Sequence, residues 1–209
     1  MPNTSDIPSP SLIASLRRQP LLVVLRAVEP LALSAALARL VAIGVRHVEI
    51  AWSDHRHWPA QCSALIERFP GVWFGAASIV SSQALRAVAE SGLSFAVSPV
   101  LDPDLLEQAA RLGITLVPGV LTPSEVHHAR RLGCSMVKLF PASAVGSGYW
   151  QRLHAPLGAL PFCIAAGGLA ADDVDEWLAA GVDAVALGAS LVGDQAWSRL
   201  EQWLADHHP

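Results

Sequence analysis

The stretch Leu21-Leu22-Val23-Val24-Leu25-Arg26-Ala27-Val28-Glu29-Pro30 decides the fold class. It begins as a short apolar run, which is typical of a buried strand. It then passes through a polar turn into a pattern of helical spacing over residues 30–43. An open doubly wound sheet that binds a dinucleotide would carry a GxGxxG motif in this first turn, and none is present. The stretch therefore favours a strand–helix unit of a barrel.

The same unit recurs along the chain. Strands are predicted at residues 21–27, 47–52, 72–77, 95–98, 114–118, 136–140, 162–165 and 184–187. Helices are predicted at residues 30–43, 58–69, 82–91, 104–112, 124–132, 149–157, 172–180 and 196–206, with an extra helix at 9–18. Eight such repeats in 209 residues predict an α/β fold. We expect a single (β/α)8 TIM barrel with an extra N-terminal helix, forming one domain over residues 1–209.

Composition excludes several classes of partner. Hydrophobic residues make up 52% and charged residues 15% of the chain, yet no apolar run reaches the roughly 18 residues that a membrane span requires. The formal net charge is −4 and no basic stripe is present, so neither nucleic acid nor a membrane is an expected partner. Sparse surface charge predicts that part of the outer surface is buried in an oligomer.

The cysteines indicate the compartment. Cys62, Cys134 and Cys163 are odd in number and widely spaced, which is typical of thiols in a reducing cytosol rather than of a disulfide or zinc set. Residues 1–10 are polar and contain proline, without a basic-then-apolar signal pattern. The sequence therefore predicts a cytoplasmic protein.

Lys138 is the one lysine of the chain, since the other 13 of its 14 Lys and Arg residues are arginine. It lies in the apolar run Met136-Val137-Lys138-Leu139-Phe140-Pro141. Burial among apolar neighbours lowers a lysine pKa, and the neutral amine can attack a carbonyl, which arginine cannot do. The run therefore indicates a Schiff-base lysine. The alternative is a lysine that only extends its charge to the surface.

Polar residues interrupt the apolar runs at strand ends, where barrel enzymes hold their chemistry. Glu49 lies in Val48-Glu49-Ile50-Ala51, and burial would raise its pKa to a range that suits proton transfer near neutral pH. Arg26 ends the first strand and has the fork geometry that suits a carboxylate or phosphate. Ser78 and Ser98 follow the third and fourth strands. The alternative is a structural ion pair between Glu49 and an arginine.

Glycines follow the last two predicted strands. Gly167-Gly168 comes after the seventh strand and Gly188-Ala189-Ser190 after the eighth. In barrels these two loops often form a phosphate site, because backbone amides can approach phosphate oxygens where no side chain intervenes. The pair of loops predicts such a site, and plain turn glycines are the alternative. His55 and His57 show no recognised ligand spacing, so we expect no metal.

These residues together resemble the class I aldolases that cleave 2-keto-3-deoxy-6-phosphogluconate (KDPG), with the related 2-keto-3-deoxy-6-phosphogalactonate and 4-hydroxy-2-oxoglutarate (KHG) aldolases. The resemblance runs from about residue 21 to residue 192. Its most specific part is the lysine in Val137-Lys138-Leu139-Phe140-Pro141-Ala142 with Val48-Glu49-Ile50 upstream. The other matching segments are residues 23–27, 75–78, 97–99, 117–125 and 167–168.

The resemblance implies roles for individual residues. Lys138 would form the Schiff base and Glu49 would move protons, while Arg26 and Ser78 would contact the pyruvoyl carboxylate. The remaining residues expected to contact substrate are Pro99, Phe140, Gly167, Gly168, Gly188, Ala189 and Ser190, with Gly168 and the Gly188 loop at the phosphate.

The family also implies an assembly and a reaction. It implies a cytosolic homotrimer of barrels that needs neither metal nor cofactor and acts on small 2-keto acids. The reaction is cleavage of a 2-keto-3-deoxy-6-phospho sugar acid to pyruvate and glyceraldehyde 3-phosphate, as in the Entner–Doudoroff pathway of carbohydrate metabolism. Cleavage of 4-hydroxy-2-oxoglutarate to pyruvate and glyoxylate is a second expected activity. The alternatives are another phosphate-binding barrel enzyme, such as an isomerase or epimerase, or a degenerate barrel that binds an anionic metabolite without turnover.

The chain departs from the family pattern in four places. Ala77 stands for a glycine and Ala166 for a threonine, Ser53 replaces an arginine found in some members, and Ala189 stands where a serine is usual. The lysine and glutamate chemistry survives these changes, whereas recognition of the phosphate loses a hydroxyl at Ala189 unless Ser190, one residue later, turns inward. The sequence therefore predicts an unusually modest preference for phosphorylated over unphosphorylated 2-keto acids.

Overall fold

A computed structural model describes residues 11–207 of the chain. All strands within this range are parallel and belong to one sheet. They are β1 (Leu21–Leu25), β2 (His47–Ala51), β3 (Trp73–Ala77), β4 (Phe95–Val97), β5 (Thr115–Val117), β6 (Gly119–Val120), β7 (Met136–Leu139), β8 (Phe162–Ala166) and β9 (Ala184–Leu187).

Helical segments precede, connect and follow the strands. The α-helices are α1 (Leu12–Arg18), α2 (Ser34–Ala42), α3 (Trp58–Arg68), α4 (Ser82–Ser91), α5 (Pro103–Arg111), α6 (Pro123–Arg131), α7 (Tyr149–Arg152), α8 (His154–Leu157), α9 (Val174–Ala179) and α10 (Asp194–His207). The short 3-10 helices are η1 (Pro30–Leu33), η2 (Ala142–Ala144) and η3 (Ala171–Asp173).

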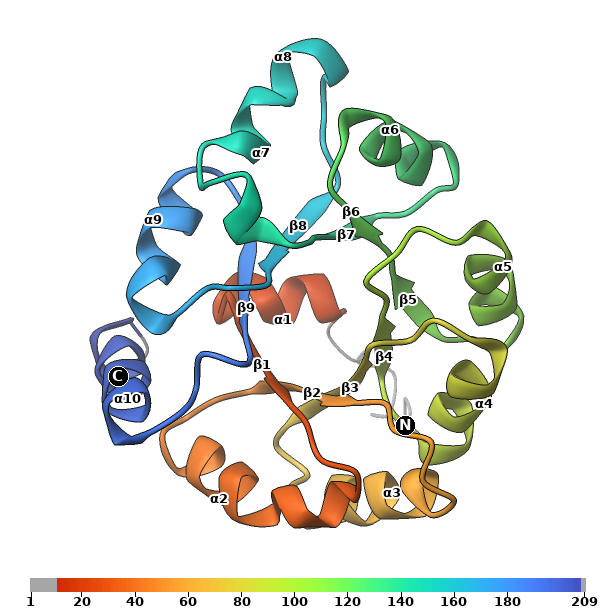
Figure 1. Ribbon diagram of the computed structural model, residues 1–209, viewed down its shortest axis with the longest axis vertical. Coiled ribbons are helices and arrows are strands. Elements are labelled where there is room, and N and C mark those ends of the chain that lie inside the picture. The colour runs from red at the N-terminus through yellow and green to blue at the C-terminus, as the bar shows by residue number, and fades with distance from the viewer. Residues whose placement is uncertain (1–10, 208–209) are drawn as a thin grey trace, which may run out of the picture.

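The strands form a nearly closed barrel of nine parallel strands in the order β5-β4-β3-β2-β1-β9-β8-β7-β6. The two strands at the ends of this order, β5 and β6, are separated in sequence by Pro118 alone. Proline has no N–H to contribute to a ladder, so it interrupts the strand at the point where pairing passes from β4 to β7. Figure 1 shows the resulting ring of strands, with α2 to α10 around it.

Two apolar clusters hold the barrel together, because successive side chains of a strand point to opposite faces. One cluster packs the outer faces of the strands against the helices, and on β2 it takes Val48 and Ile50. The other fills the barrel and includes Leu12 and Leu16 of α1. Burying one leucine side chain stabilises by about 1.5–3 kcal/mol, which anchors α1 across this end of the barrel. In Figure 1 α1 lies behind the ring, so the view faces the opposite end.

The observed elements follow the predicted ones, with breaks at particular residues. Each predicted strand coincides with an observed one, and the strand expected at residues 114–118 is interrupted at Pro118. The helices expected at residues 30–43 and 172–180 each begin as a 3-10 turn, and that at 149–157 divides into α7 and α8. The expected helix at 9–18 is described from Leu12, since residues 9 and 10 lie outside the described range. Within that range, no helix combines the length and apolarity needed to cross a membrane.

Candidate active site

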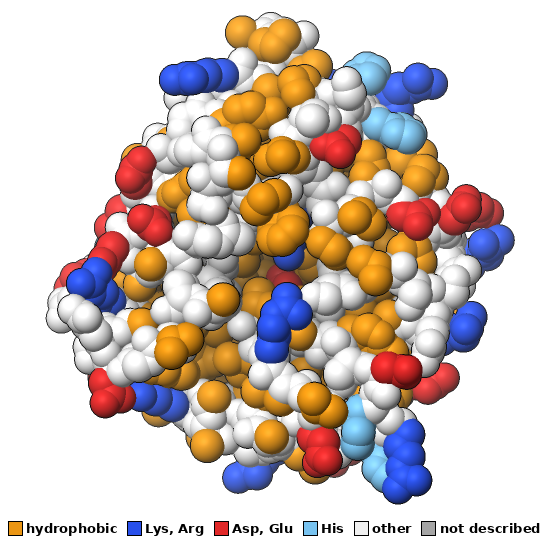
Figure 2. Space-filling model, viewed as in Figure 1, with side chains coloured by type: hydrophobic (Ala, Val, Ile, Leu, Met, Phe, Trp, Pro, Cys, Tyr) orange, Lys and Arg blue, Asp and Glu red, His pale blue; other side chains and the backbone are white. Residues whose placement is uncertain are grey.

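Glu49 of β2 and Lys138 of β7 project into the barrel from different sides of the ring. Their neighbours Val48, Ile50, Val137 and Leu139 belong to the outer apolar cluster, so both charged side chains face the interior. Strands β1, β9 and β8 separate β2 from β7 in the sheet order. Figure 2 shows acidic and basic side chains meeting in a hollow at the centre of the face opposite α1, with hydrophobic side chains around them.

Glu49 is a buried carboxyl group that lacks a full set of partners. The residue is 1% exposed, and its Oε2 atom has no hydrogen-bond partner among the described residues. Burial raises the pKa of Glu49 to about 7, although the positive charges of Lys138 and Arg26 act in the opposite direction. Near neutral pH the group therefore exists in both forms, which is the condition for giving and taking protons in one reaction.

Lys138 is 8% exposed, and burial lowers the pKa of its ammonium group. The negative charge of Glu49 raises this pKa and the positive charge of Arg26 lowers it further. No ion pair within 4.0 Å joins Lys138 or Arg26 to Glu49 among the described residues. The simple structural pair between Glu49 and an arginine is thus not formed, and the lysine keeps an amine that can lose its proton.

Arg26 and Ser78 follow β1 and β3 at the same end of the barrel. Arg26 is exposed, and its charge reaches both Glu49 and Lys138. Ser78 has a positive φ of 65°, a left-handed conformation that is uncommon for a residue other than glycine. Its hydroxyl makes no hydrogen bond with any residue in the described range, so it is available to a ligand.

Phe140 connects the lysine to the first glycine loop. Lys138 Nζ lies 4.8 Å from the centroid of the Phe140 ring. A Cβ atom on Gly167 would come within 2.9 Å of the same ring, and Gly167 has a φ of +96°. The glycine is therefore required both by backbone conformation and by the approach of the aromatic ring. Lys138, Phe140 and Gly167 form a continuous wall.

The loops after β8 and β9 are tied together. Ser190 Oγ donates a hydrogen bond to the carbonyl oxygen of Leu169 at 2.6 Å. Gly188 packs beside Val24, where an added Cβ would meet ordinary van der Waals distances of 3.5 Å or more. Ala189 is exposed. The hydroxyl of Ser190 therefore already donates its hydrogen bond within these loops.

Pro99 and Ser98 follow β4. An added Cβ on Gly119 would collide with the backbone of Pro99, which explains the glycine at the start of β6. Ser98 is buried, and its Oγ accepts a hydrogen bond from the backbone N–H of Val100 at 3.1 Å. Pro99 thus belongs to the same end of the barrel as the lysine, whereas Ser98 shapes its own turn.

A family model for KDPG and KHG aldolases matches residues 12–205, nearly the whole chain. The chain belongs to the KDPG and KHG aldolase family.

Two relatives and one solved structure illustrate the relationship. The chain is 27% identical over 173 residues to the 2-dehydro-3-deoxy-6-phosphogalactonate aldolase of Escherichia coli (strain K12), covering 82% of this chain and 84% of that protein. It is 33% identical over 141 residues to the KHG/KDPG aldolase of the same strain, covering 67% and 65%. A KDPG aldolase from Legionella pneumophila, with pyruvate captured as a covalent carbinolamine intermediate, has a TM-score of 0.75 at 24% identity, covering 91% and 95%.

These matches confirm the resemblance that the sequence motifs indicate. The protein is a class I aldolase, a lyase that acts on a carbon–carbon bond. The structural likeness to the Legionella protein adds support for the barrel fold. Within residues 11–207 no group of three or more His, Cys, Asp or Glu side chains is arranged to hold a metal ion.

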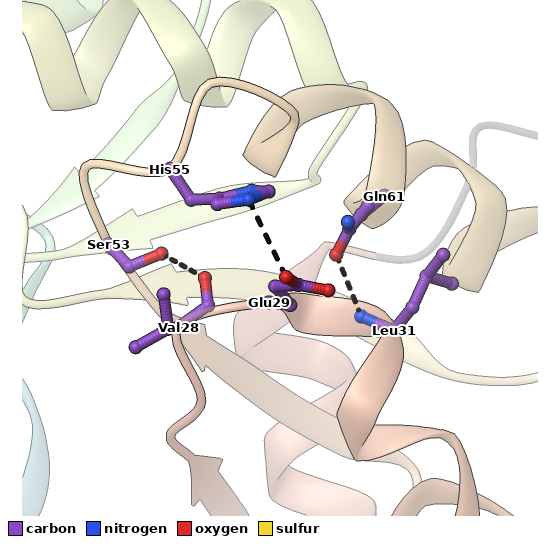
Figure 3. A network of polar contacts seen from close by, with 6 residues as sticks. All are labelled: Val28, Glu29, Leu31, Ser53, His55 and Gln61. Atoms are coloured by element: carbon purple, nitrogen blue, oxygen red, sulfur yellow. Dashed lines mark hydrogen bonds and ion pairs between the residues drawn. The ribbon is translucent and has the colours of Figure 1, made fainter.

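Sequence reasoning missed a polar network that joins the loops after β1 and β2 of this aldolase (Figure 3). Ser53 Oγ donates to the carbonyl oxygen of Val28 at 2.6 Å, and His55 Nε2 lies 3.8 Å from Glu29 Oε1. Gln61 Oε1 also accepts a hydrogen bond from the N–H of Leu31 at 3.1 Å. The network fixes the segment that follows Arg26. Ser53 therefore joins the loop after β2 to the loop after β1 in this chain.

Proposed function

We propose that this aldolase cleaves a 2-keto-3-deoxy-6-phospho sugar acid to pyruvate and glyceraldehyde 3-phosphate, and 4-hydroxy-2-oxoglutarate to pyruvate and glyoxylate. One observation carries the proposal: the sole lysine of the chain lies almost buried inside the barrel, opposite a buried glutamate with a pKa of about 7. The names of the two Escherichia coli relatives support the substrate class.

Lys138 is the nucleophile. Its neutral amine adds to the C2 carbonyl, and the carbonyl oxygen takes a proton from the acid form of Glu49. The nitrogen then gives a proton back to the Glu49 carboxylate. Loss of the C2 oxygen as water, with a proton from Glu49, leaves a protonated imine between Lys138 and C2. Burial favours this step because it lowers the lysine pKa and so increases the fraction of neutral amine.

Glu49 is the acid and base of the cleavage step. Its carboxylate takes the proton of the C4 hydroxyl, and the electrons of the C3–C4 bond move into the imine. The aldehyde leaves and an enamine remains on Lys138. Protonation of C3 by Glu49, followed by hydrolysis of the imine, releases pyruvate and the free lysine. A pKa of about 7 suits a group that serves in both directions within one cycle.

The other residues bind the substrate. Arg26 and Ser78 hold the carboxylate, since a guanidinium fork and a free hydroxyl both suit that group. The backbone amides of Gly168 and Gly188 approach the phosphate, which glycine permits. The remaining residues that we assign to the walls of the substrate site are Pro99, Phe140, Gly167, Ala189 and Ser190.

We extend the proposal to fold, assembly and location. β5 and β6 are two halves of one strand, which gives eight strand–helix units with α1 as an addition, folded as one domain. The family resemblance and the sparse surface charge support a homotrimer. The three cysteines are free thiols, which supports a cytoplasmic protein.

Reductive trapping tests the proposal. The protein is incubated with pyruvate and borohydride, digested, and mapped by peptide mass spectrometry. The expected result is one modified side chain, on the peptide that contains Lys138. Because the chain has a single lysine, the amino terminus is the one other primary amine of the chain, and its peptide serves as the internal control. Absence of label on the Lys138 peptide would overturn the proposal.

A further inference from the structure

Ser143, in the 3-10 helix η2 that follows β7, lies directly against the second glycine of the loop after β8. An added Cβ on Gly168 would collide with Ser143 Oγ, so the serine hydroxyl occupies the space where a side chain of residue 168 would stand. The two segments are also joined through the backbone, because the N–H of Ser143 donates to the carbonyl oxygen of Gly167 at 3.1 Å. The position of the hydroxyl is therefore set by the same loop that we assign to the phosphate.

The Ser143 hydroxyl is free, whereas the other serine hydroxyl of this region is not. Ser143 is exposed, and its Oγ makes no hydrogen bond with any described residue. Ser190 Oγ, by contrast, is held by the carbonyl oxygen of Leu169. Ala189 has no hydroxyl at all. Among the described residues beside the glycine loop, Ser143 is thus the serine whose hydroxyl has no hydrogen-bond partner within the protein.

The placement of Ser143 also fits the far end of an extended substrate. The wall begins at Lys138 Nζ, passes over the Phe140 ring to Gly167, and reaches Ser143 through Gly168. Its inner end is almost buried and its outer end is exposed. A 2-keto acid bound covalently at Lys138 would therefore direct its opposite end toward Ser143.

We propose that Ser143 donates a hydrogen bond to the terminal phosphate of the substrate and replaces the hydroxyl that Ala189 lacks. This inference rests on the proposed function and names a further residue that determines its specificity. It also changes an expectation from sequence, because the modest phosphate preference was predicted from the hydroxyl missing at Ala189, without a substitute for it. With Ser143 supplying the hydrogen bond, the preference for the phosphorylated substrate is kept.

The test compares two substrates across a set of variants. Pyruvate release is measured with 2-keto-3-deoxy-6-phosphogluconate and with 4-hydroxy-2-oxoglutarate, for wild type, Ser143→Ala, Ser143→Thr and Ser143→Ala/Ala189→Ser. A hydrogen bond to a charged group contributes about 1.5–3 kcal/mol, which corresponds to about 10- to 150-fold. Ser143→Ala should raise the KM for the phosphorylated substrate by about this factor and leave the unphosphorylated one unchanged. Ser143→Thr should keep the wild-type preference, and Ala189→Ser should restore part of it in the double variant.

Ser147→Ala is the matched control, since Ser147 lies on the same segment but its hydroxyl donates to Glu176 Oε1. It should not change the ratio between the two substrates. If Ser143→Ala raises the KM equally for both substrates, or leaves the KM for the phosphorylated substrate unchanged, the inference is overturned. Trapping of Lys138 by pyruvate would still leave the proposed function standing. A wild-type protein that cleaves only 4-hydroxy-2-oxoglutarate also overturns it. Failure of trapping in the wild type rejects the proposed function itself, and this inference with it.

Discussion

His47 and Glu49 lie two residues apart on β2, both point into the barrel, and both are buried, at 0% and 1% exposure. His47 has a partner for each ring nitrogen: Nδ1 lies 3.1 Å from the carbonyl oxygen of Leu21, and Nε2 lies 2.8 Å from Ser15 Oγ. Glu49 Oε2 has no hydrogen-bond partner among the described residues. The two side chains are therefore equally buried and differ in whether they have hydrogen-bond partners.

The difference separates a polar group with a structural role from one that we propose to be catalytic. A carbonyl oxygen can only accept, so Nδ1 of His47 carries the hydrogen and Nε2 accepts from the Ser15 hydroxyl. Burial lowers the pKa of His47 to about 4 and keeps the ring neutral. This pair ties α1 to the barrel. Two residues along the strand, burial raises the pKa of Glu49 to about 7, and an unpaired oxygen faces the site. Two buried polar groups on one strand thus serve opposite ends of the molecule.

Replacing the lysine should give the largest effect. In Lys138→Arg the charge near Glu49 is kept but the nucleophile is lost, because arginine does not deprotonate near neutral pH. We expect no pyruvate trapping at position 138 and no measurable cleavage, with an unfolding transition close to wild type. Pyruvate release and peptide mapping measure the first two, and urea denaturation the third. Undiminished cleavage would show that the carbonyl chemistry does not use this residue.

Glu49→Gln should reduce cleavage about 10²–10⁴-fold, the usual contribution of a positioned acid or base. Glutamine keeps the size of the side chain and part of its hydrogen bonding but cannot transfer protons. Trapping by pyruvate and borohydride should persist at a slower rate. If Glu49 instead resembled His47 in being structural, the variant would lose stability and turn over normally.

Lys138, Glu49 and Arg26 could be singled out from the sequence because polar residues inside or at the end of apolar strand runs are costly unless they have a use. The structure brings their charges within reach of one another, and their roles in catalysis stay a prediction. The sequence could not distinguish the hydroxyl of Ser190, which is bonded to Leu169, from that of Ser143, which is free. That distinction depends on which loops meet in space, and no local pattern around either serine carries it.

The fold was predictable at the level of strand and helix, since the apolar runs and the helical spacing are strong local signals. The division between β5 and β6 was not predicted, although Pro118 was visible in the sequence. Its consequence appears only when the pairing partner changes from β4 to β7. The sequence places His47 in a strand but predicts no role for its side chain, because its partners Ser15 and Leu21 lie 32 and 26 residues away.

The pH dependence of stability should have opposite signs for the two side chains of β2. The pKa of Glu49 rises from 4.5 to about 7 on folding, so its contribution is present below pH 4.5 and is lost as pH rises to 7. The pKa of His47 falls from 6.5 to about 4, so its contribution is present above pH 6.5 and is lost as pH falls to 4. Each change is on the order of 3 kcal/mol at most.

Urea denaturation at a series of pH values measures both effects. Relative to wild type, Glu49→Gln should gain stability as pH rises from 4.5 to 7. His47→Leu should lose stability relative to wild type as pH rises from 4 to 6.5. Parallel slopes for the two variants would contradict the assignment of one group as buried acid and the other as buried neutral ring.

Ser15→Ala should have the smallest effect and should be confined to stability. The substitution removes the hydroxyl that donates to Nε2 of His47, and a buried acceptor left without its partner costs about 1–3 kcal/mol. Alanine favours the helix by up to about 0.7 kcal/mol, so the net loss should be about 1 kcal/mol. Ser198→Ala is the control, because Ser198 is an exposed helical serine whose hydroxyl bonds the backbone of Asp194. Cleavage kinetics should be unchanged in both variants, since α1 lies at the end of the barrel opposite Lys138.

A double-mutant cycle with His47→Leu tests whether Ser15 and His47 act as a pair. The losses of stability in the two single variants should sum to more than the loss in the double variant, because removing both partners leaves no unpaired atom between them. Additive losses would mean that Ser15 and His47 stabilise the protein independently, and that the ring on β2 is not held by α1.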